Sequence, residues 1–188
     1  MRFAFNERKT AQAMAFLLSR HHGKMNYMVA VKVLYLADRK TLIETGRPIT
    51  GDWMVSLPFG PTLSLTLNLI RDSSHGDFGP WHEYIARHWR FDIKLAKRNP
   101  ERDELSQFEM ETITAADAEI GWMSWRQVSD YSHANWPEWR DPKRSSHGIE
   151  PEEILRIANK TPAEIEQASR VAHELWLFER PSLAGRSS

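Results

Sequence analysis

Apolar residues near the start of the chain recur with helical spacing. Ala11, Met14, Ala15 and Leu18 stand at positions i, i+3, i+4 and i+7, which places them on one face of a helix. Polar and charged residues fill many of the positions between them. The pattern therefore predicts an amphipathic helix over about residues 7–21.

The next segment predicts a longer helix at the centre of the fold. From Met28 to Ala37 the chain is apolar on most sides, and then it becomes polar until Gly46. A helix that is apolar all round is buried, whereas its polar end reaches the surface. Glycine often ends a helix because it adopts a positive φ without strain, so Gly46 is the expected C-terminal cap.

The stretch that follows mixes turn residues with a short apolar run. Apolar and smaller side chains alternate over Trp53–Leu57, which predicts a short strand. Pro48 and Gly51 are expected to form the turn before this strand. Gly60 and Pro61 are expected to end it, with Pro61 as the first residue of the next helix.

A second strand is predicted from strict alternation around residue 90. Apolar side chains recur at every second position, with charged residues between them, at Trp89, Phe91, Ile93 and Leu95. Period-two alternation of this kind indicates a strand that buries one face. All four apolar side chains are therefore expected to point towards the core.

The second half of the chain carries several helix signals. Ser106 with Glu109 forms a capping-box pattern, and Thr161-Pro162 with Glu164 forms another. Pro151 suits a first helical position, a further helix is predicted around Trp125–His133, and the last helix is expected to end near Glu179. The segment "SSHGDFGPW" is predicted to be a loop.

These elements together predict a mainly α protein with a few short β-strands, in the α+β class. One compact helical domain with a small hairpin or sheet is expected over residues 1–180. Residues 181–188, "PSLAGRSS", are expected to form a disordered tail.

Composition restricts the class of protein. The 188 residues include no cysteine, which excludes disulfides and thiolate metal sites and suits a reducing cytoplasm. No apolar run approaches the roughly 20 residues that span a membrane, and the charged N-terminal stretch does not have the pattern of a signal peptide. A cytoplasmic protein without a membrane partner is expected.

The charge is unevenly distributed although its sum is zero. Residues 1–100 carry 15 Lys and Arg against 8 Asp and Glu, and residues 101–188 carry 10 against 17. Such asymmetry indicates a nucleic-acid-binding face, a polarised partner, or two halves that attract each other. Nucleic-acid binding by a winged-helix-like arrangement stays open as the less favoured alternative.

Tests for catalytic and ligand-binding motifs do not favour an enzyme. A phosphate-binding loop is excluded because Asp52 follows Gly51 and no lysine lies between residues 46 and 64. No His-Glu-x-x-His motif occurs, and a lone His133 near Asp130 is more typical of a structural histidine than of a metal ligand. A hydrolase built on Asp38, Asp52 and His133 is disfavoured, since no nucleophile elbow accompanies them. No cofactor or metal is expected.

Tryptophan is unusually frequent. Four of the eight tryptophans lie within eighteen residues, at Trp122, Trp125, Trp136 and Trp139. One interpretation is a large aromatic core, and the other is a protein interface, where Trp and Arg are the usual hot-spot residues. The loop chemistry of "WPEWRDPKR" favours at least partial exposure of its side chains.

Several segments resemble one family. The stretch "VKVLYLADRKTLIETGRPITGDWMVSLPFGPTLS" is similar to the pattern of the SocA-like Panacea antitoxin domain, and "DELSQFEMETI", "DYSHANWPEWRDP" and "EEILRIANKT" support the likeness. The resemblance covers about residues 10–170. The positions that match the family motif and are expected to serve its structure are Tyr35, Asp38, Arg39, Gly46, Pro48, Gly51, Asp52, Gly60 and Pro61.

The resemblance implies an antitoxin that neutralises a toxin by direct protein contact, without a cofactor. The toxin would be encoded nearby and is expected to block translation; a homo-oligomer is also compatible with the sequence. The residues expected to contact the partner are Trp136, Trp139, Arg140, His133 and Trp53.

Overall fold

The structure is a computed structural model that describes residues 1–72 and 79–179. The predicted disordered tail 181–188 and most of the predicted 73–81 loop lie outside these ranges. In the described part the helices are α1 (Glu7–Arg20), α2 (Tyr27–Thr45), α3 (Ser64–Asp72), α4 (Pro80–Tyr84), α5 (Gln107–Ile120), α6 (Trp125–Asn135), α7 (Pro151–Ile157) and α8 (Pro162–Glu179).

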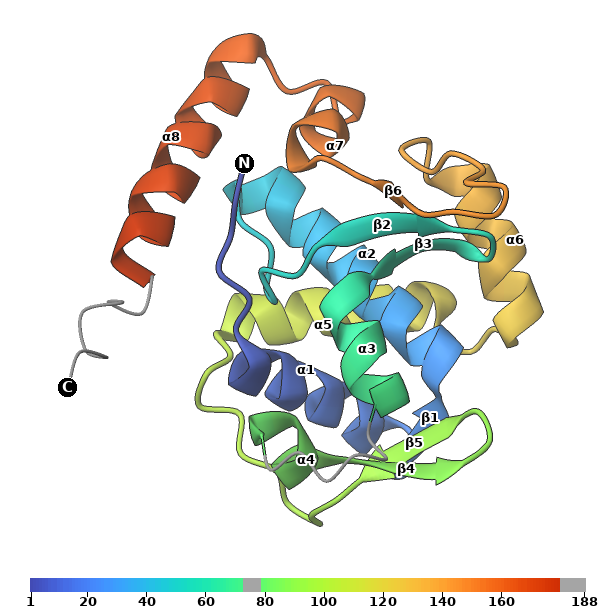
Figure 1. Cartoon of the computed structure of the whole chain (residues 1–188). Coiled ribbons are helices and arrows are strands. Elements are labelled where there is room, and N and C mark those ends of the chain that lie inside the picture. Colours follow the sequence, from blue (N-terminus) through green and yellow to red (C-terminus); the bar gives the residue numbers. More distant parts are fainter. Residues whose placement is uncertain (73–78, 180–188) are drawn as a thin grey trace, which may run out of the picture.

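Two small antiparallel sheets accompany the helices. Their strands are β1 (Lys24–Asn26), β2 (Met54–Leu57), β3 (Gly60–Leu63), β4 (Ile85–Trp89), β5 (Asp92–Leu95) and β6 (His147–Gly148). One sheet has the strand order β1-β5-β4 and the other β3-β2-β6. The first lies beside α4 and the start of α2, whereas the second lies at the other end of the molecule, near α6 and α7 (Figure 1). The predicted class, mainly α with a few short strands, is confirmed.

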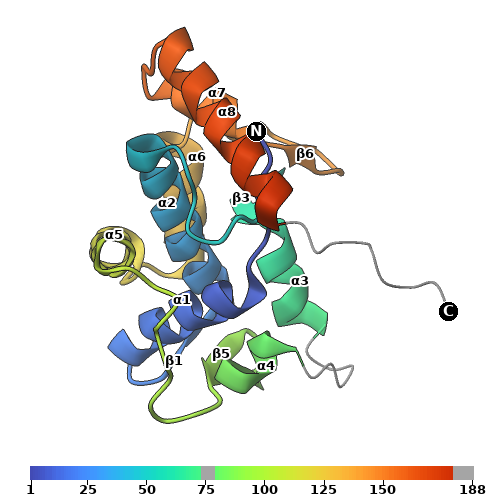
Figure 2. The same cartoon turned by 90° about the vertical axis from the view of Figure 1, so that its left-hand side faces the viewer.

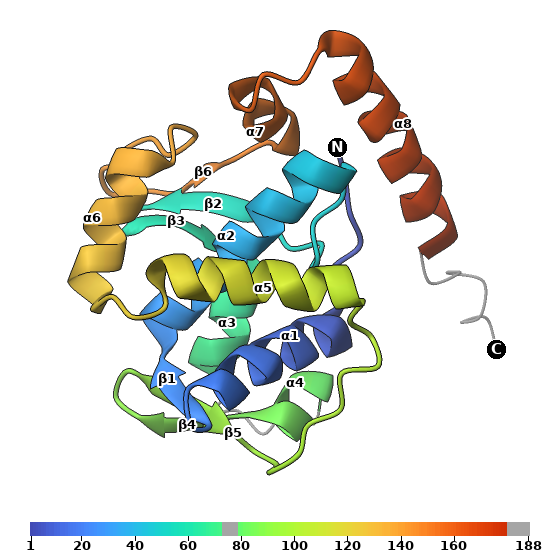
Figure 3. The same ribbon diagram turned by 180° about the vertical axis from the view of Figure 1, so that it is seen from behind.

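The central position predicted for the second helix is confirmed. α2 runs through the middle of the molecule, and α5 packs across it (Figure 3). Twelve of its residues are buried, including the whole run Val29–Asp38. Asn26 caps its first turn, and Gly46 ends it with φ 77° in the left-handed region. The expected α1 and its buried apolar face are also present.

The expectation that Pro61 begins a helix is wrong. Residues Gly60–Leu63 form β3, which pairs with β2 over Met54–Leu57, and α3 begins only at Ser64. Proline is compatible with this position because β3 is the edge strand of its sheet, so the missing N–H breaks no ladder between central strands.

The strand predicted around residue 90 is a hairpin instead. β4 ends at Trp89 and β5 begins at Asp92, so a turn interrupts the apparent alternation. Of the apolar side chains expected to face the core, Ile93 is buried, whereas Trp89 is 76% exposed and Phe91 is 55% exposed. A turn of two residues preserves the alternation in the letters while it reverses the direction of the chain.

The helix-start signals of the second half are confirmed. Ser106 and Glu109 form a capping box at α5. At α8 the backbone N–H of Thr161 donates to the Glu164 carboxylate, and the backbone N–H of Glu164 donates to the Thr161 hydroxyl. Pro151 occupies the first turn of α7. A further capping box, not predicted from the sequence, joins Ser124 and Gln127 at the start of α6.

The last helix lies at one side of the molecule. α8 packs mainly on α7 (Figures 1 and 2), and its Ala168 lies against Gly46 at the end of α2, where a Cβ on Gly46 would be 3.1 Å from Ala168 Cβ. Of its side chains up to Phe178, only Ala172 is buried. A cavity of about 670 Å³ separates α8 from α2 and is lined mainly by apolar side chains such as Leu42, Leu155 and Leu175. Within the described ranges, no helix has the length and apolar character to cross a membrane.

Candidate partner-binding surface

One face of α2 ties the segment after α6 to the core. Tyr35 and Arg39 lie one turn apart and both reach the carboxylate of Glu138. The Tyr35 hydroxyl donates to Glu138 Oε1 at 2.9 Å, and Arg39 Nε donates to the same oxygen at 2.7 Å. The Glu138 side chain is completely buried. Burial of a carboxylate is tolerable here because a charge and a hydroxyl both satisfy it.

Trp136 belongs to the core rather than to the surface. Its ring lies 5.0 Å from that of Tyr35 and 6.2 Å from that of Tyr131, and the residue is only 3% exposed. The loop exposure expected for Trp136 is therefore not found, because the Glu138 bonds draw the segment against α2. For this residue the structure matches the aromatic-core interpretation.

Lys32 of α2 connects the central helix to the β2–β3 hairpin. Its side chain is buried, and its ammonium donates to the carbonyl of Pro61. Gly60 has φ 96°, and a Cβ there would lie 2.1 Å from Ser132 Oγ and 2.9 Å from Lys32 Nζ. Only glycine fits this contact between hairpin, α2 and α6. Burial lowers the pKa of Lys32 to about 7.

Trp139 and His133 support the same hairpin from the side. Trp139 Nε1 donates to the carbonyl of Leu57 at 2.9 Å, and the two rings stack with centroids 3.8 Å apart. Burial, followed by the nearby Lys32 charge, lowers the pKa of His133 and favours the neutral ring. Both predicted contact residues thus help to fix the turn between β2 and β3.

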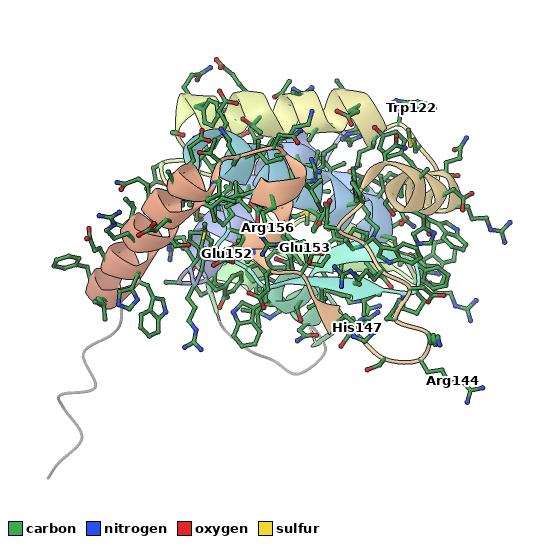
Figure 4. All side chains as sticks on the ribbon, turned by 90° about the horizontal axis from the view of Figure 1, so that it is seen from above. Trp122, Arg144, His147, Glu152, Glu153 and Arg156 are labelled. Carbon is green, nitrogen blue, oxygen red and sulfur yellow. The ribbon has the colours of Figure 1, made fainter. Side chains whose placement is uncertain are left out.

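An exposed aromatic cluster sits on this supported turn. Phe59, at the tip of the turn, is 54% exposed and meets the ring of Trp125 edge to face at 5.8 Å. The guanidinium of Arg126 lies 5.1 Å from the Trp125 ring centroid. Trp122, in the turn before α6, is 70% exposed and points away from the molecule (Figure 4). We call Phe59, Trp122, Trp125 and Arg126 the α6 surface.

The two other predicted contact residues differ in position. Arg140 follows Trp139, and its backbone N–H donates to Ser56 Oγ of β2 at 3.3 Å, while its exposed side chain forms an ion pair with Glu153 of α7. Trp53 is 68% exposed but precedes β2, whereas Trp139 contacts the residue that ends it. Four residues of strand separate the two places by about 13 Å. The predicted set is therefore distributed over more than one part of the surface.

Asp38 fixes the loop after α2. It is fully buried and accepts hydrogen bonds from the backbone of Ile49 at 2.9 Å and of Thr50 at 3.1 Å, and from the Thr50 hydroxyl. Burial raises the pKa of Asp38 to about 7, against the opposing effect of these donors. Gly51, with φ 69°, continues this loop, and a Cβ on it would lie 2.2 Å from the Ala4 carbonyl.

Asp52 caps the start of α3. Its carboxylate accepts from the backbone of Leu65 at 2.9 Å, and from the backbone and hydroxyl of Thr66 at 2.7 Å each. These donors belong to the first turn of α3, where a carboxylate satisfies free N–H groups and favours the helix dipole. Asp52 thus occupies the helix N-terminus that a phosphate would need. Asp38 and Asp52 lie before β2 and His133 beyond its end, so the structure does not assemble them as one site.

The roles of Lys32, Phe59 and Glu138 were not predicted from the sequence, and for Trp125 the core and interface interpretations were both left open. A signal for Lys32 was present, because it precedes Tyr35 by three residues and Arg39 by seven on the same helical face. Glu138 carried no such signal, since its partners lie about a hundred residues earlier in the chain. Among the described residues, no group of three His, Asp or Glu side chains is arranged to hold a metal ion.

Comparison with known proteins gives one finding. The family model described as "Antitoxin SocA-like, Panacea domain" matches residues 31–140. This range begins within α2 and includes the Asp38 and Asp52 loops, the β2–β3 hairpin, α6 and the segment up to Arg140, and it excludes α7 and α8. Comparisons with curated proteins and with solved structures give no match. The match covers more than half of the chain and includes all the motif positions described above, and we conclude that this protein belongs to the SocA-like Panacea antitoxin domain family.

Proposed function

We propose that this protein is an antitoxin that neutralises a toxin encoded nearby through direct protein–protein contact and without catalysis. Membership of the antitoxin family supports the general role. The observation that carries the contact mechanism is the exposed α6 surface, where large aromatic side chains and an arginine gather on a hairpin that the core holds in place.

The residue types of the α6 surface suit a protein partner. Binding energy in interfaces concentrates on a few Trp, Tyr and Arg side chains in well-packed positions. Trp125 lies between Phe59 and Arg126, so its ring is already oriented before a partner arrives. Because Lys32 and Trp139 fix the hairpin, little conformational entropy is lost when Phe59 is covered.

We infer that the partner is a toxin that blocks translation, which places both proteins in the cytoplasm. Trp139, His133 and Arg140 then border the interface, whereas Trp136 contributes by holding the segment in place. Trp53, at the far end of β2, would join the interface only if the toxin extends along that strand.

The test is co-expression with the product of the adjacent gene. Growth should be inhibited by that product alone, restored when this protein is present, and the two proteins should co-purify. A pair of substitutions, Phe59→Ala with Trp125→Ala, should abolish rescue and weaken the measured Kd at least tenfold, because hot-spot truncations cost about 2 kcal/mol or more.

Trp89→Ala is the control, since Trp89 is an exposed aromatic residue, at 76%, but lies on the β4–β5 hairpin. It should leave rescue and Kd unchanged. If the α6 substitutions have no effect while Trp53→Ala abolishes binding, the proposed surface is wrong although the antitoxin role stands. If no neighbouring gene product is toxic, the role itself is contradicted.

A further inference from the structure

The β1-β5-β4 sheet borders a pocket whose charged side chains are all basic. The pocket has a volume of about 510 Å³ and lies between the end of α1, the turn into β1 and the end of β5. No described carboxylate lines it, and its ionisable lining residues are all Lys, Arg or His: His22, Lys24, His88, Lys94, Lys97 and Arg98. A concave, uniformly basic surface attracts and concentrates anions.

Two of these lysines oppose each other directly. Lys24 of β1 pairs in register with Lys94 of β5, and both side chains are exposed. Like charges opposite each other destabilise a sheet. Neither lysine forms an ion pair with a described residue, whereas Lys97 is held by Glu101. Two mutually repelling ammonium groups are thus left free beside the pocket.

The same sheet carries exposed aromatic side chains at its hairpin tip. Trp89 is 76% exposed, and it follows His88, which lines the pocket. Phe91 is 55% exposed and stacks at 6.4 Å on Tyr27. Arg90, between the two aromatic residues, is also exposed. Aromatic rings next to cationic side chains are the usual platform for unpaired bases and their phosphates.

We propose that the β1-β5-β4 sheet binds a single strand of nucleic acid, with phosphates at the pocket and bases stacked on Trp89 and Phe91. Both the unpaired positive charges and the exposed aromatic rings are needed to explain this surface. An acidic protein would use the lysines, but it would not require two exposed rings at the hairpin tip. The sheet lies at the other end of the molecule from the β3-β2-β6 sheet and the 136–146 loop, and its β4–β5 hairpin lies on the same side as α6 (Figures 1 and 3).

The proposal is tested with the full chain and fluorescein-labelled 20-nucleotide probes of mixed sequence. Anisotropy titrations at 50 to 200 mM NaCl compare single-stranded DNA, single-stranded RNA and duplex DNA. The two single-stranded probes show whether the protein prefers DNA or RNA. Single strands should bind more tightly than the duplex. Affinity should fall with salt, with a slope of about −0.7 for each phosphate neutralised.

Two pairs of substitutions separate the charges from the rings. Lys24→Gln with Lys94→Gln should weaken binding about tenfold or more at 100 mM salt and reduce the magnitude of the salt slope by about 1.4, which corresponds to two phosphate contacts. Trp89→Ala with Phe91→Ala should weaken binding about fivefold or more while leaving the slope unchanged, because stacking is not a charge interaction.

Lys143→Gln with Arg144→Gln is the matched control. It removes the same charge from two exposed residues of the 136–146 loop, which lies at the other end of the molecule from the sheet (Figure 1), and Arg144 projects outward (Figure 4). This control should change Kd less than twofold. All variants alter exposed side chains, and their thermal unfolding should confirm that they fold as the unaltered protein does.

Four results would overturn the proposal. They are no anisotropy change at 50 mM salt with protein up to about 50 μM, equal weakening by the control pair, tighter binding of duplex with no effect of the aromatic pair, and equally tight binding of a labelled 20-residue polyglutamate. The last result would assign the surface to an acidic protein segment. None of these measurements depends on the toxin, so they leave the proposed antitoxin role untouched.

Discussion

The core around α2 and the β1-β5-β4 sheet differ in how their charged side chains are paired. Around α2, each buried carboxylate is matched: Glu138 by Tyr35 and Arg39, and Asp38 and Asp52 by donors from the loops that they hold. On the β1-β5-β4 sheet, by contrast, lysines stand opposite each other without an ionic partner in the described ranges.

The difference follows from solvation. A buried ion that lacks partners costs several kcal/mol, so a stable fold must satisfy it. An exposed ammonium keeps its water, and leaving it unpaired costs little. Matched charges therefore indicate residues that hold the fold together, and unmatched charges indicate residues free to meet a ligand. The predictions below test this division, in order of decreasing effect.

The largest effect is expected at Glu138. Glu138→Ala should lower the free energy of unfolding by about 3–5 kcal/mol, because it leaves the partly buried Arg39 and the buried Tyr35 hydroxyl without their acceptor. Chemical denaturation by urea measures the change. Glu119→Ala is the matched control: it also removes the acceptor of an α2 cation, Lys40, and of a tyrosine hydroxyl, Tyr131, but the ion pair is about one-third exposed, so the loss should be only about 1–2 kcal/mol. Equal losses of unfolding free energy for the two variants would contradict the distinction between buried charges that hold the fold together and exposed charges that do not.

Lys32 predicts a dependence of stability on pH. Its pKa is about 7 in the folded protein and has the ordinary value of 10.5 in the unfolded chain. Between these values the unfolded chain binds more protons, so stability should rise with pH from 7 towards 10, by at most about 1.4 kcal/mol per pH unit.

Lys32→Met isolates this contribution, because it keeps the length of the side chain and removes the charge. The difference in unfolding free energy between the unaltered protein and this variant should shift in favour of the unaltered protein as the pH is raised from 7 to 9.5. Parallel pH profiles would show that the ammonium does not lose its proton in this range.

Asp52 should show an intermediate effect. Asp52→Ala removes the acceptor for Leu65 and Thr66 at the start of α3 and should cost about 1–3 kcal/mol. For a chain of this length that corresponds to a decrease in Tm of roughly 2–4 °C per kcal/mol. Asp52→Asn keeps one oxygen acceptor and should lose less; an equal loss for both variants would indicate that the charge matters more than the hydrogen bonds.

The smallest effect, and one of opposite sign, is expected on the sheet. Lys24→Gln should leave stability unchanged or raise the unfolding free energy by up to about 0.5 kcal/mol, since it removes repulsion by Lys94. The gain should shrink when salt is raised from 20 to 500 mM, because screening weakens the same repulsion. A loss of stability on substitution would mean that Lys24 has a structural role.

Local patterns predicted the elements that local rules govern. The amphipathic α1, the buried α2 with its Gly46 cap, and the capping boxes at Ser106 and Thr161 were all found where the spacing placed them. These signals work because backbone groups within one or two turns satisfy each other, so the relevant residues are close in sequence.

Two regions show where local pattern fails. The alternation from Trp89 to Leu95 reads as one strand but folds as a hairpin, and Pro61 reads as a helix start but pairs in β3. In both places a two-residue turn folds the chain back on itself as a hairpin, and the pattern of apolar letters does not show where the chain reverses. The candidate site depends on more distant contacts: the tryptophan-rich segment could be identified from sequence, but the separation of buried Trp136 from exposed Trp125 could not.

By itself, the sequence determined the helical character of the chain, the turns around Gly51 and Gly60, and the family to which the motif from Lys32 to Pro61 belongs. Tertiary structure decided which charged residues are satisfied and which are free, because that depends on groups brought together from distant positions. Glu138 became a structural residue only when α2 met the segment after α6, and Lys24 and Lys94 became unpaired neighbours only when β1 joined β5.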